Sequence, residues 1–284
     1  RDLLLTKASS DFDWSEISPT IFGAVFESTL NPETRRSGGM HYTSIENIHK
    51  VIDPLFLDEL KAEFEEIRNI AVKRTRERKL QDFQKKLSTL TFLDPACGSG
   101  NFLTETYLSL RRLENEILQE LQGGQMVLGY DNMNPIQVSI SQFYRNKNND
   151  FAVTVAKTAL WIAESQMMKE TESIVLMHLA FLPLKTNAFI HKGNALQVDW
   201  ESVIPKYQLS YIMGNPPFVA RAGRTKAKDS SSKGMLDDTQ KTDRLNVFGE
   251  DLGNVDYVAC WFKKAAVFTK NTAIRCAFVA TDLI

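Results

Sequence analysis

From Thr91 onward, short apolar stretches alternate with longer segments of helical periodicity. Each apolar stretch ends in glycine or polar residues, which is typical of strands that alternate with helices. We therefore predict an α/β fold with a doubly wound, mostly parallel sheet. The expected strands lie in TLTFLD, QMVLGYD, NAFI, LSYIMG and IRCAFVAT, and the expected helices at about 101–121, 150–168 and 253–269. Ligands of such sheets bind at the carboxyl ends of the strands.

The first 90 residues do not follow this alternation. Apolar residues between about 44 and 88, such as Leu57, Leu60 and Phe64, fall on one helical face, so we expect an N-terminal helical segment over 1–90 and a second unit over 91–284. Within the first unit, KRTRERK (73–79) is either a solvated helix face or a phosphate contact. In the second unit, 221–244 is rich in basic, serine and glycine residues, which predicts a mobile loop.

Composition excludes several classes of protein. The 284 residues carry a formal net charge of −1, which argues against a strongly basic nucleic-acid binder. No apolar run approaches the ~18 residues of a membrane helix, and no signal peptide opens the chain, so we expect no membrane partner. The cysteines lack paired spacing and nearby histidines, which predicts a cytoplasmic location and no metal site. Because the chain begins at Arg1 rather than Met, we expect it to be a piece of a longer protein.

The stretch DPACGSGNF (94–102) is a candidate ligand site. Asp94 ends a strand, Gly98 and Gly100 form a turn, and a helix follows. Small residues such as Ala96 allow close approach of a ligand to the backbone, and the helix start offers free N–H groups. The stretch lacks the third glycine of a dinucleotide site and the Lys-Ser/Thr of a phosphate-binding loop. It suits a cofactor with an ammonium group and no phosphate, although a purely structural turn remains an alternative.

A second motif, NPPF (215–218), follows the apolar stretch LSYIMG. Two consecutive prolines cannot continue a strand, so the motif predicts a rigid turn at the strand's carboxyl end. Together, LDPACGSGNFL and the later NPPF resemble the cofactor and catalytic motifs of S-adenosylmethionine-dependent DNA amino-methyltransferases. SGGMHYTS (37–44) resembles the upstream segment of the gamma class of these enzymes. NDFAVTVAKTALWIAESQM and NVDYVACWFKKA are similar to the methylase region of fused restriction–modification enzymes of the MmeI and YeeA type.

The resemblance implies a Rossmann-like class I methyltransferase whose catalytic core, 91–284, lacks its last strands and its recognition domain. It implies methylation of the N6 amine of a flipped adenine in double-stranded DNA, with S-adenosylmethionine as cofactor. The side-chain oxygen of Asn215 and the carbonyl of Pro216, aimed by Pro217, would accept hydrogen bonds from the amine, and Phe218 would stack on the base. The expected partner is the rest of a longer polypeptide, and any nuclease would lie outside this chain.

The resemblance also implies the cofactor contacts. They are Tyr42 and Thr43 of the upstream segment, Asp94, Ala96, Gly98, Gly100 and Asn101 of the glycine turn, and Asn194 and Ala195 of HKGNALQVDW. Alternatives remain open at this point: cytosine N4, an RNA base or a glutamine amide as the methylated group, or a catalytically inert DNA-binding remnant.

One position departs from the family pattern. Members of the family have an acidic residue after the second strand, which binds the ribose hydroxyls, and just before the helix at 150 this chain has YRNKNND. Lys147 therefore stands where the acid is expected, and lysine cannot accept hydrogen bonds from ribose. Asp131 is a second candidate for the acid. The departure predicts weak cofactor binding as one possible outcome.

Overall fold

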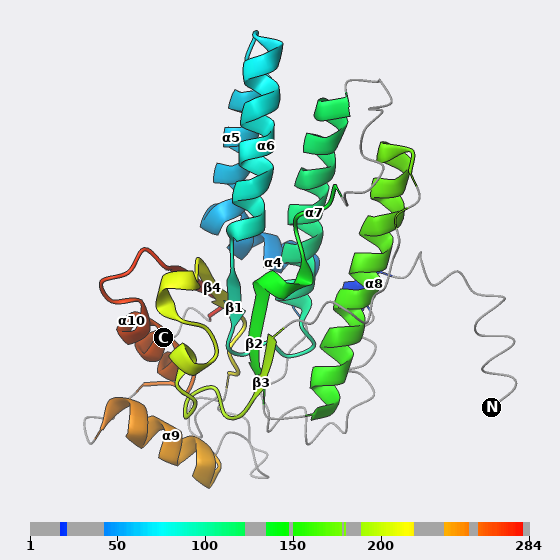
Figure 1. The fold of residues 1–284 in the computed structure, drawn as a ribbon. Coiled ribbons are helices and arrows are strands. Elements are labelled where there is room, and N and C mark those ends of the chain that lie inside the picture. The colour runs from blue at the N-terminus through cyan, green and yellow to red at the C-terminus, as the bar shows by residue number, and fades with distance from the viewer. Residues whose placement is uncertain are drawn as a thin grey trace, which may run out of the picture.

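The computed structural model of the chain describes residues 18–21, 43–122, 135–147, 150–177, 179, 189–218, 236–249 and 255–280. Its centre is a five-stranded sheet in the order β3-β2-β1-β4-β5, in which every neighbouring pair is parallel (Figure 1). The strands are β1 (Phe92–Asp94), β2 (Phe143–Lys147), β3 (Phe189–Lys192), β4 (Tyr211–Gly214) and β5 (Arg275–Phe278). The predicted doubly wound, parallel sheet is confirmed.

The strand order places β1 next to β4. From β1 the chain builds outward through β2 to β3, and it then returns to the other side of β1 to add β4 and β5. The pairing of Phe92 with Tyr211 and of Leu93 with Ile212 fixes the register of β1 and β4. Such a reversal of strand order opens a crevice at the carboxyl ends of the two central strands, where ligands of doubly wound sheets bind.

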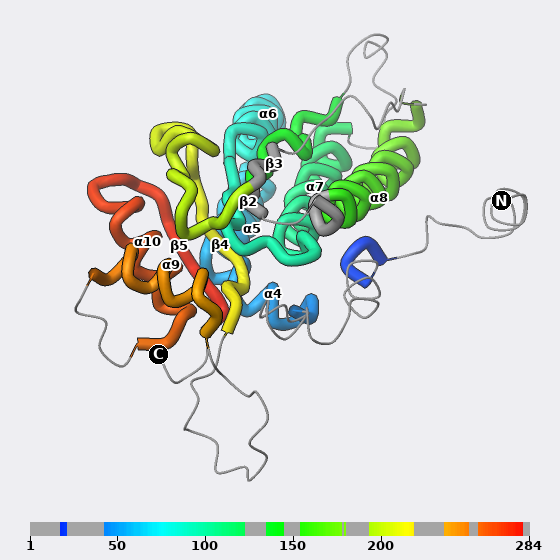
Figure 2. Tube along the Cα trace, turned by 90° about the horizontal axis from the view of Figure 1, so that it is seen from below, coloured from blue at the N-terminus to red at the C-terminus, as the bar shows by residue number. Residues whose placement is uncertain are grey.

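Helices cover both faces of the sheet (Figure 2). On one face lie α7 (Asn101–Gln122) and α8 (Asp150–Val175), and on the other lies α10 (Ala259–Thr269) with α9 (Asp238–Phe248) beside it. Successive strand residues point to opposite faces, so Phe92 belongs to the core under α7 and Leu93 to the core under α10. Phe92 also stacks on the rings of Phe143 and Tyr211 with centroids 5.3 and 5.4 Å away.

The helical segment before β1 extends one of these cores. It contains α4 (Ile45–Ile52), a π-helical turn η2 (Asp53–Leu57), α5 (Asp58–Arg68) and α6 (Lys73–Thr89), as the apolar periodicity predicts. Ile48, Phe56, Phe64 and Leu80 are buried in the same cluster as Phe92. The helices therefore pack directly on the sheet, and the division of the chain at residue 90 stays a prediction of the sequence.

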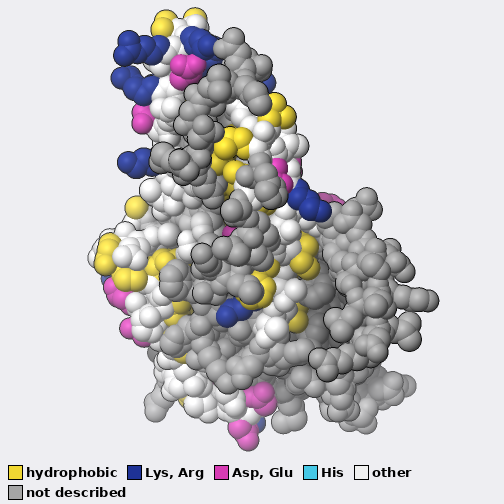
Figure 3. Space-filling view, turned by 45° about the vertical axis from the view of Figure 1, so that its right-hand side comes forward, with side chains coloured by type: hydrophobic (Ala, Val, Ile, Leu, Met, Phe, Trp, Pro, Cys, Tyr) yellow, Lys and Arg dark blue, Asp and Glu magenta, His cyan; other side chains and the backbone are white. Residues whose placement is uncertain are grey.

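The basic stretch 73–79 lies at the far end of α6. Lys and Arg side chains gather at the tip of the helical projection (Figure 3), and Lys73, Arg74, Arg78 and Lys79 are exposed. At a rise of 1.5 Å per residue, the 17-residue helix separates this tip from β1 by about 25 Å. The tip is therefore remote from the carboxyl ends of the strands, where a site is expected.

The prediction of a mobile loop over 221–244 is wrong for its last residues, because α9 begins at Asp238. Asp237 and Gln240 form a capping box: the Asp237 carboxylate accepts from the Gln240 backbone N–H, and the Gln240 side chain accepts from the Asp237 N–H. This reciprocal cap satisfies two backbone donors and starts a helix in a polar sequence. The expected strand at 125–131 and residues 219–235 lie outside the described residues.

Two further expectations concern helix bounds and membranes. The helix expected from about 253 begins only at Ala259 in the structure. Short 3₁₀ turns also lie between the longer elements: η3 (Ile140–Gln142), η4 (Trp200–Ser202) and η5 (Lys206–Gln208). Within the described ranges, no helix combines the length and the apolar character that a bilayer crossing requires.

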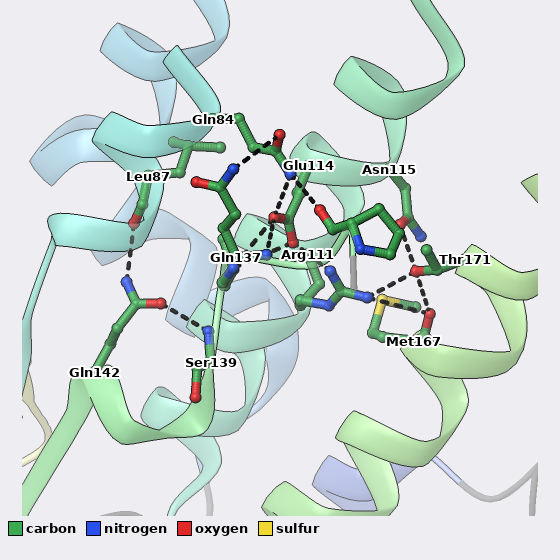
Figure 4. A network of polar contacts seen from close by, with 12 residues as sticks. Gln84, Leu87, Arg111, Glu114, Asn115, Gln137, Ser139, Gln142, Met167 and Thr171 are labelled. Atoms are coloured by element: carbon green, nitrogen blue, oxygen red, sulfur yellow. Dashed lines mark hydrogen bonds and ion pairs between the residues drawn. The ribbon is translucent and has the colours of Figure 1, made fainter. Parts of the chain in front are cut away.

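A buried polar network holds three helices together (Figure 4). Arg111 and Glu114 of α7 form an ion pair with exposed fractions of 1% and 0%. Glu114 accepts from the side chain of Gln84 in α6 at 2.8 Å and from the backbone N–H of Gln137 at 2.7 Å, and Arg111 donates to Thr171 of α8 at 2.7 Å. The network therefore fixes the segment that leads into β2 against α6, α7 and α8.

The network predicts a large loss of stability when Glu114 is replaced by Ala. The substitution leaves Arg111 as a buried charge without its carboxylate partner, which typically costs about 3–5 kcal/mol. Chemical denaturation of wild type and variant measures the difference. Lys241→Ala is the control, because the Lys241–Asp238 pair is exposed, and it should change stability by less than about 1 kcal/mol. Similar losses in both variants would contradict the assigned role of the network.

Candidate functional site

The carboxyl ends of β1 and β4 approach one another so closely that only glycine fits at the end of β4. A Cβ atom on Gly214 would lie 2.4 Å from the Oδ1 atom of Asp94, and Gly214 has a φ of +156°. The Asp94 side chain is 1% exposed. The strand-end acid and the NPPF turn, which begins at the next residue, Asn215, are therefore immediate neighbours.

The glycine turn after β1 is held by local hydrogen bonds. The backbone N–H of Ala96 donates to Oδ1 of Asp94 at 2.9 Å, and the N–H of Gly100 donates to the carbonyl of Cys97 at 2.6 Å. Gly98 and Gly100 have φ values of 47° and 87°, in the region that favours glycine. The turn then leads directly into α7 at Asn101. The sequence pattern Asp-x-x-x-Gly-x-Gly therefore produces the strand–turn–helix arrangement that it predicts.

A polar hollow opens between this turn and the NPPF turn. It is lined by Thr43, Asp94, Ala96, Cys97, Gly98, Ser99, Asn101, Phe102 and Asn215. The Oδ1 atoms of Asn101 and Asn215 are buried and have no hydrogen-bond partner among the described residues. Leaving a buried acceptor unpaired costs about 1–3 kcal/mol, so each of these oxygens calls for a donor, from water or from a ligand in the hollow. A buried carboxylate and two free amide oxygens suit a ligand that carries amine or ammonium groups.

Of the NPPF residues, Asn215 lines this hollow. Asn215 donates through Nδ2 to the Oγ1 atom of Thr43 at 2.9 Å, which leaves its Oδ1 free. Pro216 is buried, and Pro217 and Phe218 are partly buried. The turn therefore places the amide oxygen of Asn215 beside the glycine turn, and an aromatic residue, Phe218, follows three positions later.

The turn after β3 is built differently from the sequence-based expectation. The carboxamide of Asn194 is engaged on both sides: its Oδ1 accepts from the Leu196 N–H at 3.0 Å, and its Nδ2 donates to Asp243 of α9 at 2.8 Å. The buried carboxylate of Asp243 also accepts from the Gln197 side chain and the Tyr257 hydroxyl, each at 2.8 Å. Asn194 therefore fixes its own turn to α9 in this structure.

Lys264 of α10 secures the same turn from the other side. Its ammonium donates to the carbonyls of Ala195, Leu196 and Val198 at 2.9, 2.8 and 2.6 Å and lies 5.4 Å from the centre of the Trp200 ring. Burial lowers the pKa of Lys264 to about 8, against the weaker opposing effect of Asp199 and Asp243. Burial and the hydrogen bond to Asp243 raise the pKa of Tyr257, which keeps that hydroxyl protonated as a donor.

The structure brings six of the predicted site residues together in the hollow. Thr43, Asp94, Ala96, Gly98, Asn101 and Asn215 line the hollow, and Gly100 lies in the same turn. Asn194 and Ala195 do not line it. Tyr42 and Asp131 lie outside the described residues, and Lys147 is the last residue of β2, the strand beside β1. No group of His, Cys, Asp and Glu that could hold a metal occurs in the described part of the chain.

Sequence reasoning missed three residues that shape the site. Gly214 permits the contact with Asp94, while Asp243 and Lys264 hold the turn after β3. Only the Asp-x-x-Gln capping box at Asp237 gave a local signal, because it could have predicted the helix that carries Asp243.

Comparisons with known proteins agree with this geometry. The model of the family described as "MmeI, DNA-methyltransferase domain" matches residues 70–284. The chain is 37% identical to DNA methyltransferase A of Bacillus subtilis over 99% of its own length and 30% of that protein. It is 24% identical to a putative type II restriction enzyme and methyltransferase of Methanocaldococcus jannaschii over 70% of its length and 18% of that protein.

A solved structure extends the likeness to three dimensions. The type IIL restriction–modification enzyme MmeI, in complex with DNA, superposes with a TM-score of 0.81 and 44% identity, covering 94% of this chain and 34% of that one. This agreement confirms the expected Rossmann-like methyltransferase fold. The chain thus spans about a third or less of each of these proteins.

The contact between Gly214 and Asp94 predicts that Gly214→Ala weakens the binding of S-adenosylmethionine, the cofactor that the sequence predicts. The added methyl group would displace the Asp94 carboxylate, and overpacking of this kind typically costs about 1–3 kcal/mol, so affinity should fall roughly tenfold or more. Isothermal titration calorimetry measures the affinity. Gly249→Ala is the matched control, because Gly249 also has a positive φ, +71°, but a Cβ there meets nothing within 4 Å. An unchanged affinity in Gly214→Ala would refute the prediction.

Proposed function

Since this chain belongs to the MmeI family of DNA-methyltransferase domains, we propose that it transfers a methyl group from S-adenosylmethionine to the N6 amine of adenine in DNA. It would do so in the cytoplasm as the modification part of a restriction–modification enzyme. The observation that carries the proposal is the buried, unpaired Oδ1 atom of Asn215 at the edge of the polar hollow. An acceptor held in this way is what an amino group requires in order to be bound and activated.

The exocyclic amine of adenine is a poor nucleophile because its lone pair is delocalised into the ring. Acceptors placed near both amine hydrogens favour a pyramidal nitrogen and free that lone pair. Asn215 offers its side-chain oxygen for one hydrogen bond, and the backbone carbonyl of Pro216 is the candidate for the other. Because the attacking nitrogen loses its proton readily once it is methylated, the site needs no strong general base. Catalysis by these residues is then mainly positioning and charge stabilisation.

Adenine inside a duplex cannot reach such a hollow, so the base must leave the helical stack first. Phe218 is partly buried and directly follows the rigid Pro216–Pro217 turn, which makes it the candidate platform for the flipped base. The partner that this arrangement fits is double-stranded DNA. Sequence recognition would come from the rest of a longer polypeptide.

Residues of the glycine turn would hold the cofactor. The Asp94 carboxylate and the free Oδ1 atom of Asn101 suit its ammonium group, while Ala96 and Gly98 allow the backbone to pack against it. The bound cofactor supplies a methyl group on a sulfonium, which is an excellent leaving group. Tyr42 and Thr43 of the upstream segment are proposed as further contacts, and Asn194 and Ala195 as backbone contacts of the turn after β3.

The test uses three variants of the natural full-length protein. Asn215→Ala removes the acceptor, so methyl incorporation into DNA should fall by two to three decades, or ~3–4 kcal/mol, with little change in cofactor affinity. Asn215→Asp keeps an acceptor oxygen and should retain partial activity. Asp94→Ala, by contrast, should weaken cofactor binding measured by calorimetry. Nucleoside analysis of the methylated DNA identifies the target base. Detection of N4-methylcytosine in place of N6-methyladenine would show that cytosine is the substrate.

Equal activity of Asn215→Ala and wild type would remove the basis of the proposal. Methylation of RNA or of a glutamine amide, with no methylation of DNA, would keep the chemistry of the site and change the substrate.

Lys147 favours a second candidate function for the chain, that of a catalytically inert DNA-binding remnant of a modification enzyme. The residue ends β2, where family members hold the ribose hydroxyls with an acid, so its presence would weaken cofactor binding. We therefore predict that Lys147→Glu strengthens binding of S-adenosylmethionine roughly 10- to 100-fold, the range of a hydrogen bond to a charged group. Lys192→Glu is the matched control, because Lys192 of β3 pairs in register with Lys147 and receives the same change of charge. Equal gains in both variants would show a general charge effect instead.

A further inference from the structure

We propose that Thr43 is a positioning residue for methyl transfer: its hydroxyl fixes the carboxamide of Asn215 so that the amide nitrogen faces Thr43 and the oxygen faces the target amine. The inference rests on the proposed function and adds a role for Thr43 that is separate from cofactor contact. It assigns the orientation of the catalytic amide to a residue 172 positions earlier in the chain.

The contact itself is specific and buried. Asn215 Nδ2 donates to Thr43 Oγ1 at 2.9 Å, and Thr43 is 8% exposed. The other end of the carboxamide, Oδ1, is buried and has no partner among the described residues. One end of the group is therefore held by the protein, while the acceptor end is available to a ligand in the hollow that both residues line.

The orientation of this carboxamide decides whether the site can work. A carboxamide has a donor end and an acceptor end of nearly the same shape, and rotation by half a turn exchanges them. In the exchanged orientation, the NH₂ group of Asn215 would face the NH₂ group of the target base, and two donors cannot form a hydrogen bond. In this structure the hydroxyl accepts from Nδ2 and so stabilises the productive orientation before the base arrives, whereas the exchanged orientation would require Thr43 to turn its own O–H toward Oδ1 and donate instead.

Thr43 is well placed for this task because its segment is anchored to the same framework as the glycine turn. Ser44 caps α4 by accepting from the Asn47 N–H, and Ile48 of that helix is fully buried in the core. His49 of α4 lies 3.2 Å from Glu105 of α7, the helix that begins at the glycine turn. Groups that orient a catalytic side chain must themselves be held rigidly, and this packing supplies that support.

Three variants of the natural full-length protein test the proposal. Thr43→Val removes the hydroxyl at constant shape, whereas Thr43→Ser keeps it. Thr106→Val is the matched control, because Thr106 is another buried threonine whose hydroxyl contacts only the sulfur of Met213, at 3.5 Å, among the hydrogen bonds seen in the described residues. Each protein is assayed for its single-turnover rate of DNA methylation at saturating cofactor and for its cofactor affinity by calorimetry.

We expect Thr43→Val to lower the rate of methylation at saturating cofactor by roughly 10- to 100-fold, whatever its effect on cofactor affinity, because the amide that acts in the transition state is no longer oriented. Thr43→Ser and Thr106→Val should stay within about threefold of wild type in both measurements. A wild-type rate in Thr43→Val overturns the proposal. So does a Thr43→Val defect that saturating cofactor repairs, because Thr43 would then act only as a cofactor contact.

A second comparison separates positioning from general damage to the structure. An aspartate at position 215 presents an acceptor in either orientation, so it does not need to be oriented. In the Asn215→Asp background, Thr43→Val should therefore cost less than about threefold in rate. An equal loss in both backgrounds overturns the proposal, whereas absence of DNA methylation by wild type would overturn the proposed function itself.

Discussion

The pairing of β1 with β4 is the constraint on which the site depends. It brings together a carboxylate that ends one strand and an amide that follows the other, although more than a hundred residues separate Asp94 from Asn215. The approach is closer than a side chain allows, since a Cβ on Gly214 would lie within 2.4 Å of Asp94. The order in which the chain adds its strands therefore decides that Asp94, the proposed cofactor contact, and Asn215, the proposed catalytic residue, share one polar hollow.

The segments around this crevice are fixed by polar contacts between distant parts of the chain. Thr43, from the segment before α4, reaches Asn215, while Asp243 of α9 and Lys264 of α10 together hold the turn after β3. Each of these contacts joins segments that are far apart in the sequence, with separations of 172, 49 and 68 residues. A site built in this way needs the whole α/β framework to be folded, because no single element contains a working part of it.

Local patterns in the sequence predicted β1, β3, β4, β5, the glycine turn and the NPPF turn, since glycine, proline and a strand-end acid constrain the backbone wherever they occur. The strand β2 (Phe143–Lys147) was not among the expected strands, because the polar residues Arg145, Asn146 and Lys147 hide its apolar pattern. Contacts between distant residues were not predictable in the same way. Nothing in the local sequence shows that Asp243 receives the side chain of Asn194, or that Gly214 must lack a side chain because Asp94 lies beside it. The helix α9 was missed because the basic and polar composition of its sequence outweighed the capping box at Asp237.

Lys147 shows how the framework and the chemistry of the site can differ. The strand that carries it is correctly placed: Arg145 pairs with Asp94, and Lys147 itself pairs with Lys192. The segment leading into this strand is held by Glu114, which accepts hydrogen bonds from the backbone N–H groups of Gln137 and Val138. The backbone at position 147, where the family resemblance places a ribose-binding acid, is therefore fixed by the sheet. We therefore propose that any weakness in cofactor binding arises from the side chain at 147 rather than from the fold, in which case a single change of side chain would reverse it.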